Sequence, residues 1–237
     1  MKKIALLLVI AIVAISCKNN DEYTITGTIA GMKSGNVYLE KQSENGMGTV
    51  AIDTVKVVDG KFEIKGKSLE PSIHFIQVDS LQGKVPFILE NGDIAITVDK
   101  DSIFKSKMSG TYSNDEFYAF NEKLGKLQKK SQAKIMKFQE DNMAKMNEAQ
   151  QKNDTVVMNS LRNEFKALRA ESTNYMNNYP KEHPKSFISV LLVENMLNNP
   201  DVKVADAEKI FNSLEESLRK SAAGKKVTEA IATQKKK

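Results

Sequence analysis

Cys17 has the most distinctive chemistry in this sequence, because it is the only cysteine among 237 residues. A thiolate is a strong nucleophile, so a single thiol is suited to covalent modification. One cysteine also excludes an internal disulfide, a Cys-x-x-Cys redox pair and a cysteine-based zinc site within the chain. His74 and His183 have no sequence-near ligand partners, and we interpret both as structural or exposed. Carboxylates are numerous but none is singled out, so we expect no catalytic set, metal or cofactor.

Residues 1–16 have the pattern of an export signal. Lys2 and Lys3 precede an apolar run over 4–15, which is shorter than the roughly 20 residues that a spanning helix needs. The segment Ala14-Ile15-Ser16-Cys17 resembles the lipobox of bacterial lipoproteins. That resemblance implies cleavage after Ser16, a lipid on the Cys17 thiol and an acyl chain on the new amino group. The alternative is a secretory signal followed by an incidental cysteine.

The polar residues 17–22 are expected to form a lipidated tether between the membrane and the folded part. Several acyl chains make such an attachment stable. Lys18 followed by Asp21 and Glu22 also resembles surface-export signals of some envelope lipoproteins, although an ordinary tether explains these residues equally well. We therefore expect a lipid-anchored protein of the cell envelope, at the periplasmic or surface face of the outer membrane, and no nucleic-acid partner.

Residues 23–110 alternate apolar and polar positions and predict about seven short strands. Turn signals separate them at Asn45-Gly46, Asp59-Gly60 and Asn91-Gly92, and the second of these lies in the clearest hairpin pattern. The third is expected to close a second tight hairpin over residues 87–96. No helical pattern interrupts the strands. This organisation predicts an antiparallel β-sandwich.

Residues 111–237 have helical periodicity and complete an α+β fold. A helix of about 35 residues is expected from a cap at Asn114, which is far longer than the mean. A second helix follows the break at Asn153-Asp154-Thr155 and ends at Tyr179-Pro180, giving a long antiparallel helical hairpin. A third helix begins near Pro184, and a fourth contains Val204 to Leu218. Gly224 is expected to end the helices before a polar, Lys-rich tail.

The helical part carries 22 of the 35 basic residues but 17 of the 30 acidic ones. Five lysines share one arc of the first helix: Lys123, Lys126, Lys130, Lys134 and Lys137. They could contact anionic head groups, an acidic partner or an unfolded client. A solvated helix face is the simpler interpretation. The methionines at 136, 143, 146 and 158 could likewise form an adaptable binding surface, but packing in the core or between helices is the simpler interpretation.

Four hydroxyl side chains each follow an aspartate and precede an aliphatic residue: Thr54, Ser80, Ser102 and Thr155. These tripeptides resemble the acceptor of a bacterial envelope O-glycosylation system. Aspartate before serine or threonine is also ordinary turn and cap chemistry, so the pattern has two explanations.

Several segments together resemble a lipoprotein domain of unknown function that precedes thioredoxin-like thiol–disulfide reductase modules. The resemblance rests on the lipobox, the strands at 23–29 and 35–39, the hairpin at 58–62 and Asn91-Gly92-Asp93. It implies a β-domain and a helical region before a reductase module. The catalytic Cys-x-x-Cys belongs to that module, so no reductase residue carries over. We expect a stand-alone accessory domain, or a chain that lost the module at the lysine run.

These observations favour a lipid-anchored binding or accessory module without catalytic activity, with a protein partner in the envelope. The helices could serve as a spacer or associate into a homo-oligomer. One alternative is a periplasmic holdase-type chaperone, because the predicted hairpin is long and Lys-rich. Another is the remnant of a thiol–disulfide oxidoreductase that has lost its catalytic module.

Overall fold

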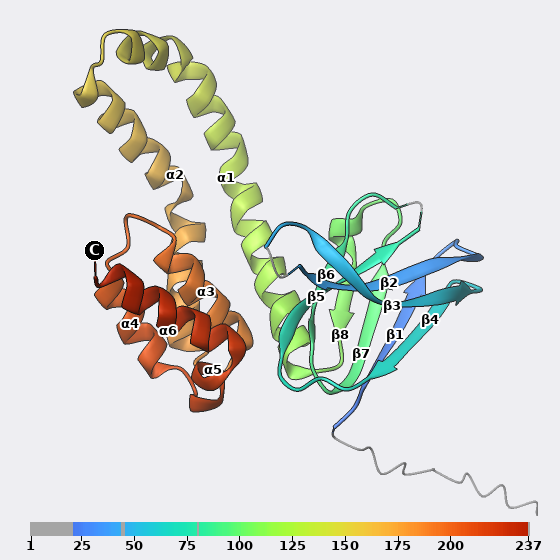
Figure 1. Cartoon of the computed structure of the whole chain (residues 1–237). Helices are drawn as coiled ribbons and strands as arrows, with labels where there is room; N and C mark the ends of the chain where they lie inside the picture. The colour runs from blue at the N-terminus through green and yellow to red at the C-terminus, as the bar shows by residue number, and fades with distance from the viewer. Residues whose placement is uncertain (1–20, 44–45, 80, 237) are drawn as a thin grey trace, which may run out of the picture.

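The computed structural model describes residues 21–43, 46–79 and 81–236 and contains a β-sheet part and a helical part (Figure 1). The strands are β1 (Tyr23–Ile29), β2 (Ser34–Gln42), β3 (Thr49–Val58), β4 (Lys61–Gly66), β5 (Ser72–Val78), β6 (Val85–Leu89), β7 (Gly92–Val98) and β8 (Lys107–Ser109), with the 3-10 helix η1 (Ile103–Lys105) before β8. The helices are α1 (Tyr112–Gln151), α2 (Thr155–Glu182), α3 (Phe187–Leu197), α4 (Val204–Ser213), α5 (Glu216–Lys220) and α6 (Ala222–Gln234). The α+β class is therefore confirmed.

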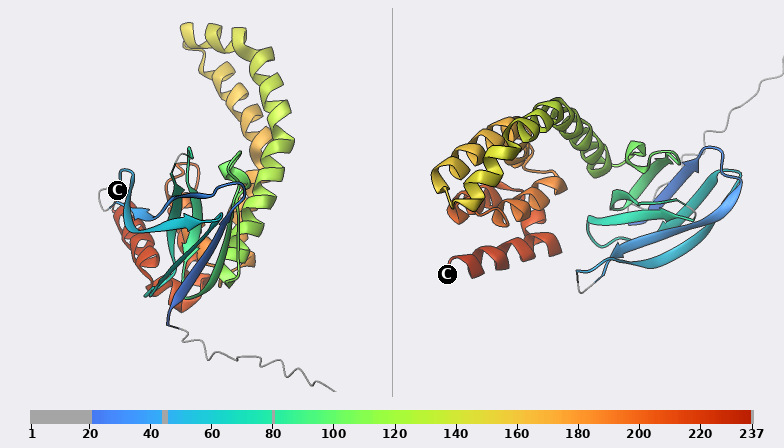
Figure 2. Two further views of the ribbon diagram at one scale, coloured as in Figure 1. Left: turned by 90° about the vertical axis from the view of Figure 1, so that its right-hand side faces the viewer. Right: turned by 90° about the horizontal axis from the view of Figure 1, so that it is seen from above.

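Within the described residues, eight strands form one sheet in the order β6-β5-β2-β3-β4-β1-β7-β8. The sheet is strongly curved and barrel-like (Figure 2). Strands β1 and β7 pair in parallel, whereas the other neighbours are antiparallel. The sequence predicted the short strands and the hairpin at Asp59-Gly60, but the hairpin predicted at Asn91-Gly92 is wrong, because β6 pairs with β5 while β7 pairs with β1 and β8. It also did not predict one curved sheet with a parallel pair in place of a two-sheet antiparallel sandwich. The difference arises because β7 pairs in parallel with β1, which keeps all the strands in one sheet.

The turn between β3 and β4 has the geometry that its sequence predicts. Asp59 and Gly60 both have positive φ, at 49° and 73°. Positive φ at both central residues is typical of the type I′ turn, whose twist matches that of the flanking strands. The Asp59-Gly60 signal therefore located this hairpin correctly.

The core of the β-sheet part consists of the inward residues of its strands. Buried side chains include Ile25, Val37, Leu39, Ile76 and Phe87, and they belong to one apolar cluster. Period-2 alternation places these side chains on one face of the sheet. Gly27 also faces this core, and a Cβ there would lie 1.9 Å from the Phe62 ring. The glycine is needed because the aromatic ring occupies that space.

Helices α1 and α2 project away from the sheet as a long arm (Figure 1). Their contacts follow an antiparallel order, from Phe120 with Tyr179 near the sheet to Phe138 with Phe165 farther out. Residues 152–154 connect them, and the Asp154 side chain accepts hydrogen bonds from Val156 and Val157 to cap α2. The predicted end at Tyr179-Pro180 is slightly wrong, because Pro180 lies in the last turn and α2 ends at Glu182.

Helices α3 to α6 form a second apolar cluster that also includes Ile88 of β6. The expected fourth helix is divided into α4 and α5, because the backbone at Leu214 is extended. Gly224 does not end the helices but lies inside α6, where a Cβ would be 2.3 Å from the Leu218 carbonyl oxygen. Close helix packing is therefore the reason for this glycine, and most of the predicted polar tail is helical. None of the described helices is long and apolar enough to span a membrane.

Candidate functional site

The far part of the arm contains a cavity of about 370 Å³ between α1 and α2, which we call the arm cavity. Its lining is mainly apolar and consists of Phe138, Gln139, Met146, Asn147, Gln150, Met158, Leu161, Arg162 and Phe165. Helical periodicity brings these side chains together, because the α1 and α2 residues recur at spacings of three, four and seven or eight. The cavity has the size and apolar character of a site for a small apolar ligand or a few side chains.

Two methionine side chains, Met146 and Met158, line the arm cavity and are 46% and 38% exposed. Met136 and Met143 do not line it, and each is 61% exposed elsewhere on α1. The sequence analysis favoured packing in the core or between helices, and this interpretation is wrong, because the exposure of these residues shows that the helix pair does not bury them. Methionine is flexible and polarisable, so such a surface fits apolar partners of different shapes.

The five lysines of the predicted patch are exposed, but most of them have partners. Lys126, Lys130 and Lys137 form ion pairs with Glu122, Glu171 and Asp141 at 3.3, 2.9 and 2.9 Å. The Lys123 ammonium lies 4.5 Å from the centre of the Tyr175 ring.

Within the described part of the chain, Lys134 has no ion-pair partner. The patch thus carries less free positive charge than its sequence indicates, because neighbouring carboxylates offset three of the five ammonium groups. This arrangement resembles the solvated face that the sequence analysis considered simpler.

A polar cluster joins the beginning of α1 to the end of α2 at the base of the arm. The Tyr179 hydroxyl donates to Glu116 Oε2 at 2.5 Å, and His183 Nδ1 lies 3.1 Å from the same oxygen. The two rings stack with their centres 4.1 Å apart. Burial, followed by the Glu116 hydrogen bond, raises the pKa of Tyr179 above its usual value, so this hydroxyl stays protonated. The cluster therefore orients the arm rather than supplying a base.

His74 lies on β5, nine-tenths buried, with its ring near Phe87. Burial lowers its pKa, which favours the neutral imidazole. Across the described residues, no group of three or more His, Cys, Asp and Glu side chains is placed to hold a metal ion. The two histidines do not come together, since His183 lies at the end of α2.

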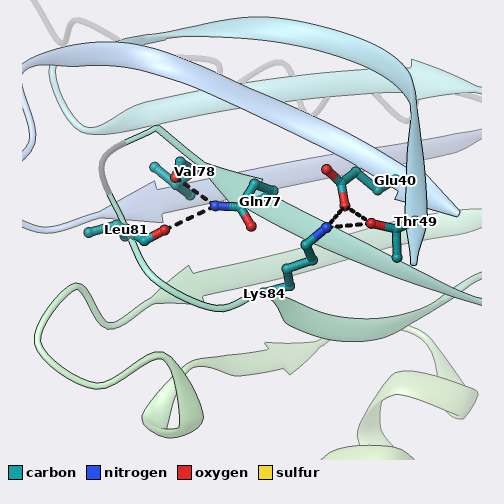
Figure 3. A network of polar contacts seen from close by, with 6 residues as sticks. All are labelled: Glu40, Thr49, Gln77, Val78, Leu81 and Lys84. Carbon is teal, nitrogen blue, oxygen red and sulfur yellow. Dashed lines mark hydrogen bonds and ion pairs between the residues drawn. The ribbon is translucent and has the colours of Figure 1, made fainter. Parts of the chain in front are cut away.

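A second polar network fastens the connection between β5 and β6 to the neighbouring strands (Figure 3). Lys84 bonds both Glu40 of β2 and Thr49 of β3, and Thr49 donates to Glu40 at 2.5 Å. Gln77 donates to the carbonyls of Val78 and Leu81, both at 3.0 Å. Burial opposes ionisation of Glu40, but the Lys84 and Thr49 hydrogen bonds outweigh it and lower the pKa of this carboxyl.

The residues considered for modification are scattered. Thr54 is exposed on β3, Ser102 is half-buried beside η1, and Thr155 is exposed at the start of α2. Two of the preceding aspartates make turn and cap contacts: Asp53 accepts from the Thr54 N–H at 2.7 Å, and Asp154 accepts from the Val157 N–H at 3.0 Å. The Ser102 N–H instead donates to Asp99, at 2.9 Å. Ser80 and Cys17 lie outside the described residues. The lipid and glycan predictions therefore remain predictions.

The sequence did not identify the arm cavity as a site. Phe138, Leu161 and Phe165 belong to apolar stripes that predict packing, and the stripes alone cannot indicate where two helices leave space. The sequence signal that could have indicated this site was the spacing of the methionines relative to these aromatic residues.

Residues 23–117 match the family model described as Domain of unknown function (DUF4369). The match includes all the strands of the sheet and the beginning of α1, up to Phe117. Comparison with curated proteins and with solved structures gave no match. The chain is thus an α+β protein whose β-sheet part resembles a domain of unknown function, while most of the arm and helices α3 to α6 lie beyond that match.

Proposed function

We propose that this protein is a lipid-anchored binding module of the bacterial cell envelope, without catalytic activity, that holds apolar segments of a partner protein in the arm cavity. The single observation that supports this function most is the mainly apolar cavity between α1 and α2, whose lining includes the exposed Met146 and Met158. The sheet part and helices α3 to α6 would hold the base of the arm. The arm would then present the cavity away from the rest of the protein.

The proposed location depends on the N-terminal sequence. The lipobox resemblance at Cys17 supports export and attachment to a membrane, and residues 17–22 would act as the tether. The family match over residues 23–117 is consistent with the accessory domain of thioredoxin-linked lipoproteins, and that link is part of the proposal. O-glycosylation at Thr54, Ser80, Ser102 or Thr155 would fit the same compartment.

A holdase-type chaperone is the form of this function that the exposed methionines favour. A holdase must bind unrelated unfolded chains, so it needs a surface that adapts to many side chains. Flexible thioether side chains provide that adaptability without requiring one partner shape. Self-association through the arm would cover the same methionines, so chaperone activity and a tight homo-oligomer are competing uses of this surface.

The test is suppression of aggregation when a urea-unfolded outer-membrane β-barrel protein is diluted with the full-length chain in mild detergent. We expect the wild type to suppress aggregation at equimolar concentration. The double variant Met146→Lys/Met158→Lys should weaken client binding by roughly tenfold or more, because charges replace two apolar contacts. Light scattering and fluorescence anisotropy measure the two effects.

Met47→Lys is the matched control, since Met47 is also exposed but lies in the β2–β3 connection. It should suppress aggregation like the wild type. Equal activity of the double variant would rule out the arm cavity as the binding site. A wild type that does not suppress aggregation and captures no envelope protein would contradict the proposed function as a whole.

A further inference from the structure

Strands β3 and β4 are neighbours in the sheet order, but they pair only at their turn. The single register pair between them is Val58 with Lys61. Beyond that pair, β3 continues to pair with β2 along its whole length, and β4 pairs with β1. The sheet therefore has an internal opening, with one strand edge of β3 on one side and one of β4 on the other.

Alternation along β3 identifies the backbone groups at this opening. In a two-residue hairpin the closing pair, here Val58 and Lys61, exchanges hydrogen bonds. The N–H and C=O groups of Lys56 and Thr54 then point to the same side as those of Val58. The Thr54 N–H is in fact bonded by the neighbouring Asp53 carboxylate at 2.7 Å and not by a strand. The edge at Thr54 and Lys56 thus has strand-pairing groups that no strand uses, before the bulge at Ile52 changes the alternation.

The outer edges of the sheet are protected in ways that the β3 edge is not. At β6, the buried Asn114 side chain accepts from the Ile88 N–H at 3.0 Å and donates to its carbonyl at 2.8 Å. At the opposite end, β8 has three residues. Covered or very short edges are common protection against unwanted strand pairing. By contrast, β3 has ten residues, of which only Val57 is buried.

The opening has a positive charge bias. Beside it, a hollow of about 430 Å³ lies over the outer face of β1, β4 and the end of β3, lined by Thr26, Gly27, Thr28, Lys56, Val58, Lys61, Phe62 and Glu63. Glu63 forms an ion pair with Lys65 at 2.7 Å. Among the described residues, Lys56 and Lys61 have no ion-pair partner. A carboxylate-bearing segment would complement these two ammonium groups.

We propose that an extended acidic segment of a partner protein adds as a strand to the free edge of β3. Its backbone would pair with the outward N–H and C=O groups of Thr54 and Lys56. Its carboxylates would contact Lys56 and Lys61. Main-chain pairing supplies affinity in this mode of recognition, and alternate side chains supply specificity. The proposal concerns a different surface from the arm cavity and does not depend on it.

The experiment uses the full-length protein and an acetylated decapeptide in which valine alternates with glutamate. Fluorescence anisotropy measures binding, and NMR hydrogen exchange measures the Lys56 amide with and without peptide. We expect saturable binding and at least tenfold slower exchange at Lys56. The same peptide with lysine in place of glutamate should bind at least tenfold more weakly. The acidic peptide should also bind at least tenfold more weakly to the double variant Lys56→Glu/Lys61→Glu than to the wild type.

Thr54→Pro removes one outward N–H without removing a bond to β2, since proline is tolerated where an edge N–H faces solvent. It should weaken peptide binding fivefold or more, whereas Thr54→Ala, which keeps the N–H, should not. Thermal unfolding checks that both variants fold. The proposal is overturned if the Lys56 amide in the free protein exchanges as slowly as those of Val55 and Val57. The proposal is equally overturned if adding the peptide changes the NMR signals of arm residues only.

Discussion

Asn114 shows how one side chain can connect the sheet to the arm. Its amide is fully buried and pairs with both backbone groups of Ile88, and it also donates to Thr111 Oγ1 at 2.8 Å. The sequence suggested Asn114 as a helix cap, but Thr111 is at the N-cap position and Asn114 is the third residue of α1. The same donor and acceptor can satisfy a helix end or a strand edge, so residue type alone could not separate the two roles.

Asn114→Ala should be strongly destabilising. The substitution leaves the buried N–H and C=O of Ile88 without partners, and each unsatisfied group costs about 1–3 kcal/mol. We expect the free energy of unfolding to fall by about 2–4 kcal/mol in urea denaturation. Asn121→Ala, at an exposed position of the same helix, should change it by less than about 0.5 kcal/mol. Equal effects of both substitutions would show that the Ile88 contact contributes little.

Glu40 predicts a pH dependence of stability. Its pKa is lower in the folded chain than the ordinary value of 4.5, because Lys84 and Thr49 stabilise the carboxylate more than burial opposes it. The stabilisation is therefore present above pH 4.5 and is lost as the pH falls through the lowered pKa.

The stability difference between wild type and Glu40→Gln should accordingly be largest near neutral pH and should shrink below pH 4.5. Urea denaturation between neutral and acidic pH measures it. Glu63→Gln is the control, because its ion pair with Lys65 is well exposed and exposed pairs contribute little. A Glu40→Gln difference that stays constant with pH would mean that the Lys84 network does not depend on the charge of Glu40.

At the scale of elements, the sequence predicted those features that depend only on neighbouring residues, such as turns, strand alternation and helix caps. The Asp59-Gly60 turn, the alternation in β1 and the cap at Asp154 all follow from backbone geometry within a few residues. The long helical periodicity likewise predicted α1 and α2. These features needed no information from distant parts of the chain.

Other elements depend on tertiary contacts and could not be predicted in this way. The parallel pairing of β1 with β7 joins segments far apart in sequence. The opening between β3 and β4 arises where the sheet curves, although the hairpin sequence favours continued pairing. Gly224 usually indicates a helix end, yet here it lets α6 approach the Leu218 and Arg219 carbonyls. Packing overrides local preference at each of these places.

At the scale of the whole molecule, apolar and polar contacts hold the sheet part against the C-terminal helices. Ile88 of β6 belongs to the apolar cluster of α3 to α6, and the Glu70 carboxylate accepts from the Ala222 N–H at the start of α6, at 3.0 Å. A carboxylate at a helix N-terminus also interacts favourably with the helix dipole. These contacts fix the base from which the arm projects, so the proposed binding sites on the arm and on β3 lie on separate surfaces.

The proposed membrane attachment predicts a simple change in the behaviour of the entire protein. In a bacterium that processes lipoproteins, Cys17→Ser should abolish incorporation of radiolabelled palmitate and move the protein from the membrane fraction to the soluble fraction. The reason is that stable attachment requires two or more acyl chains, and the proposed lipid and its processing both depend on the Cys17 thiol. Gel fluorography and fractionation measure the two effects.

Thiol titration provides the matched control, because Cys17 is the only cysteine in the sequence. Purified, denatured wild-type protein should then contain no free thiol, whereas the unprocessed chain made without export machinery should contain one per molecule. A free thiol in the exported wild type would contradict lipidation and leave the protein as an ordinary secreted one. The arm cavity would then act in solution, and its partners could not be limited to proteins near a membrane surface.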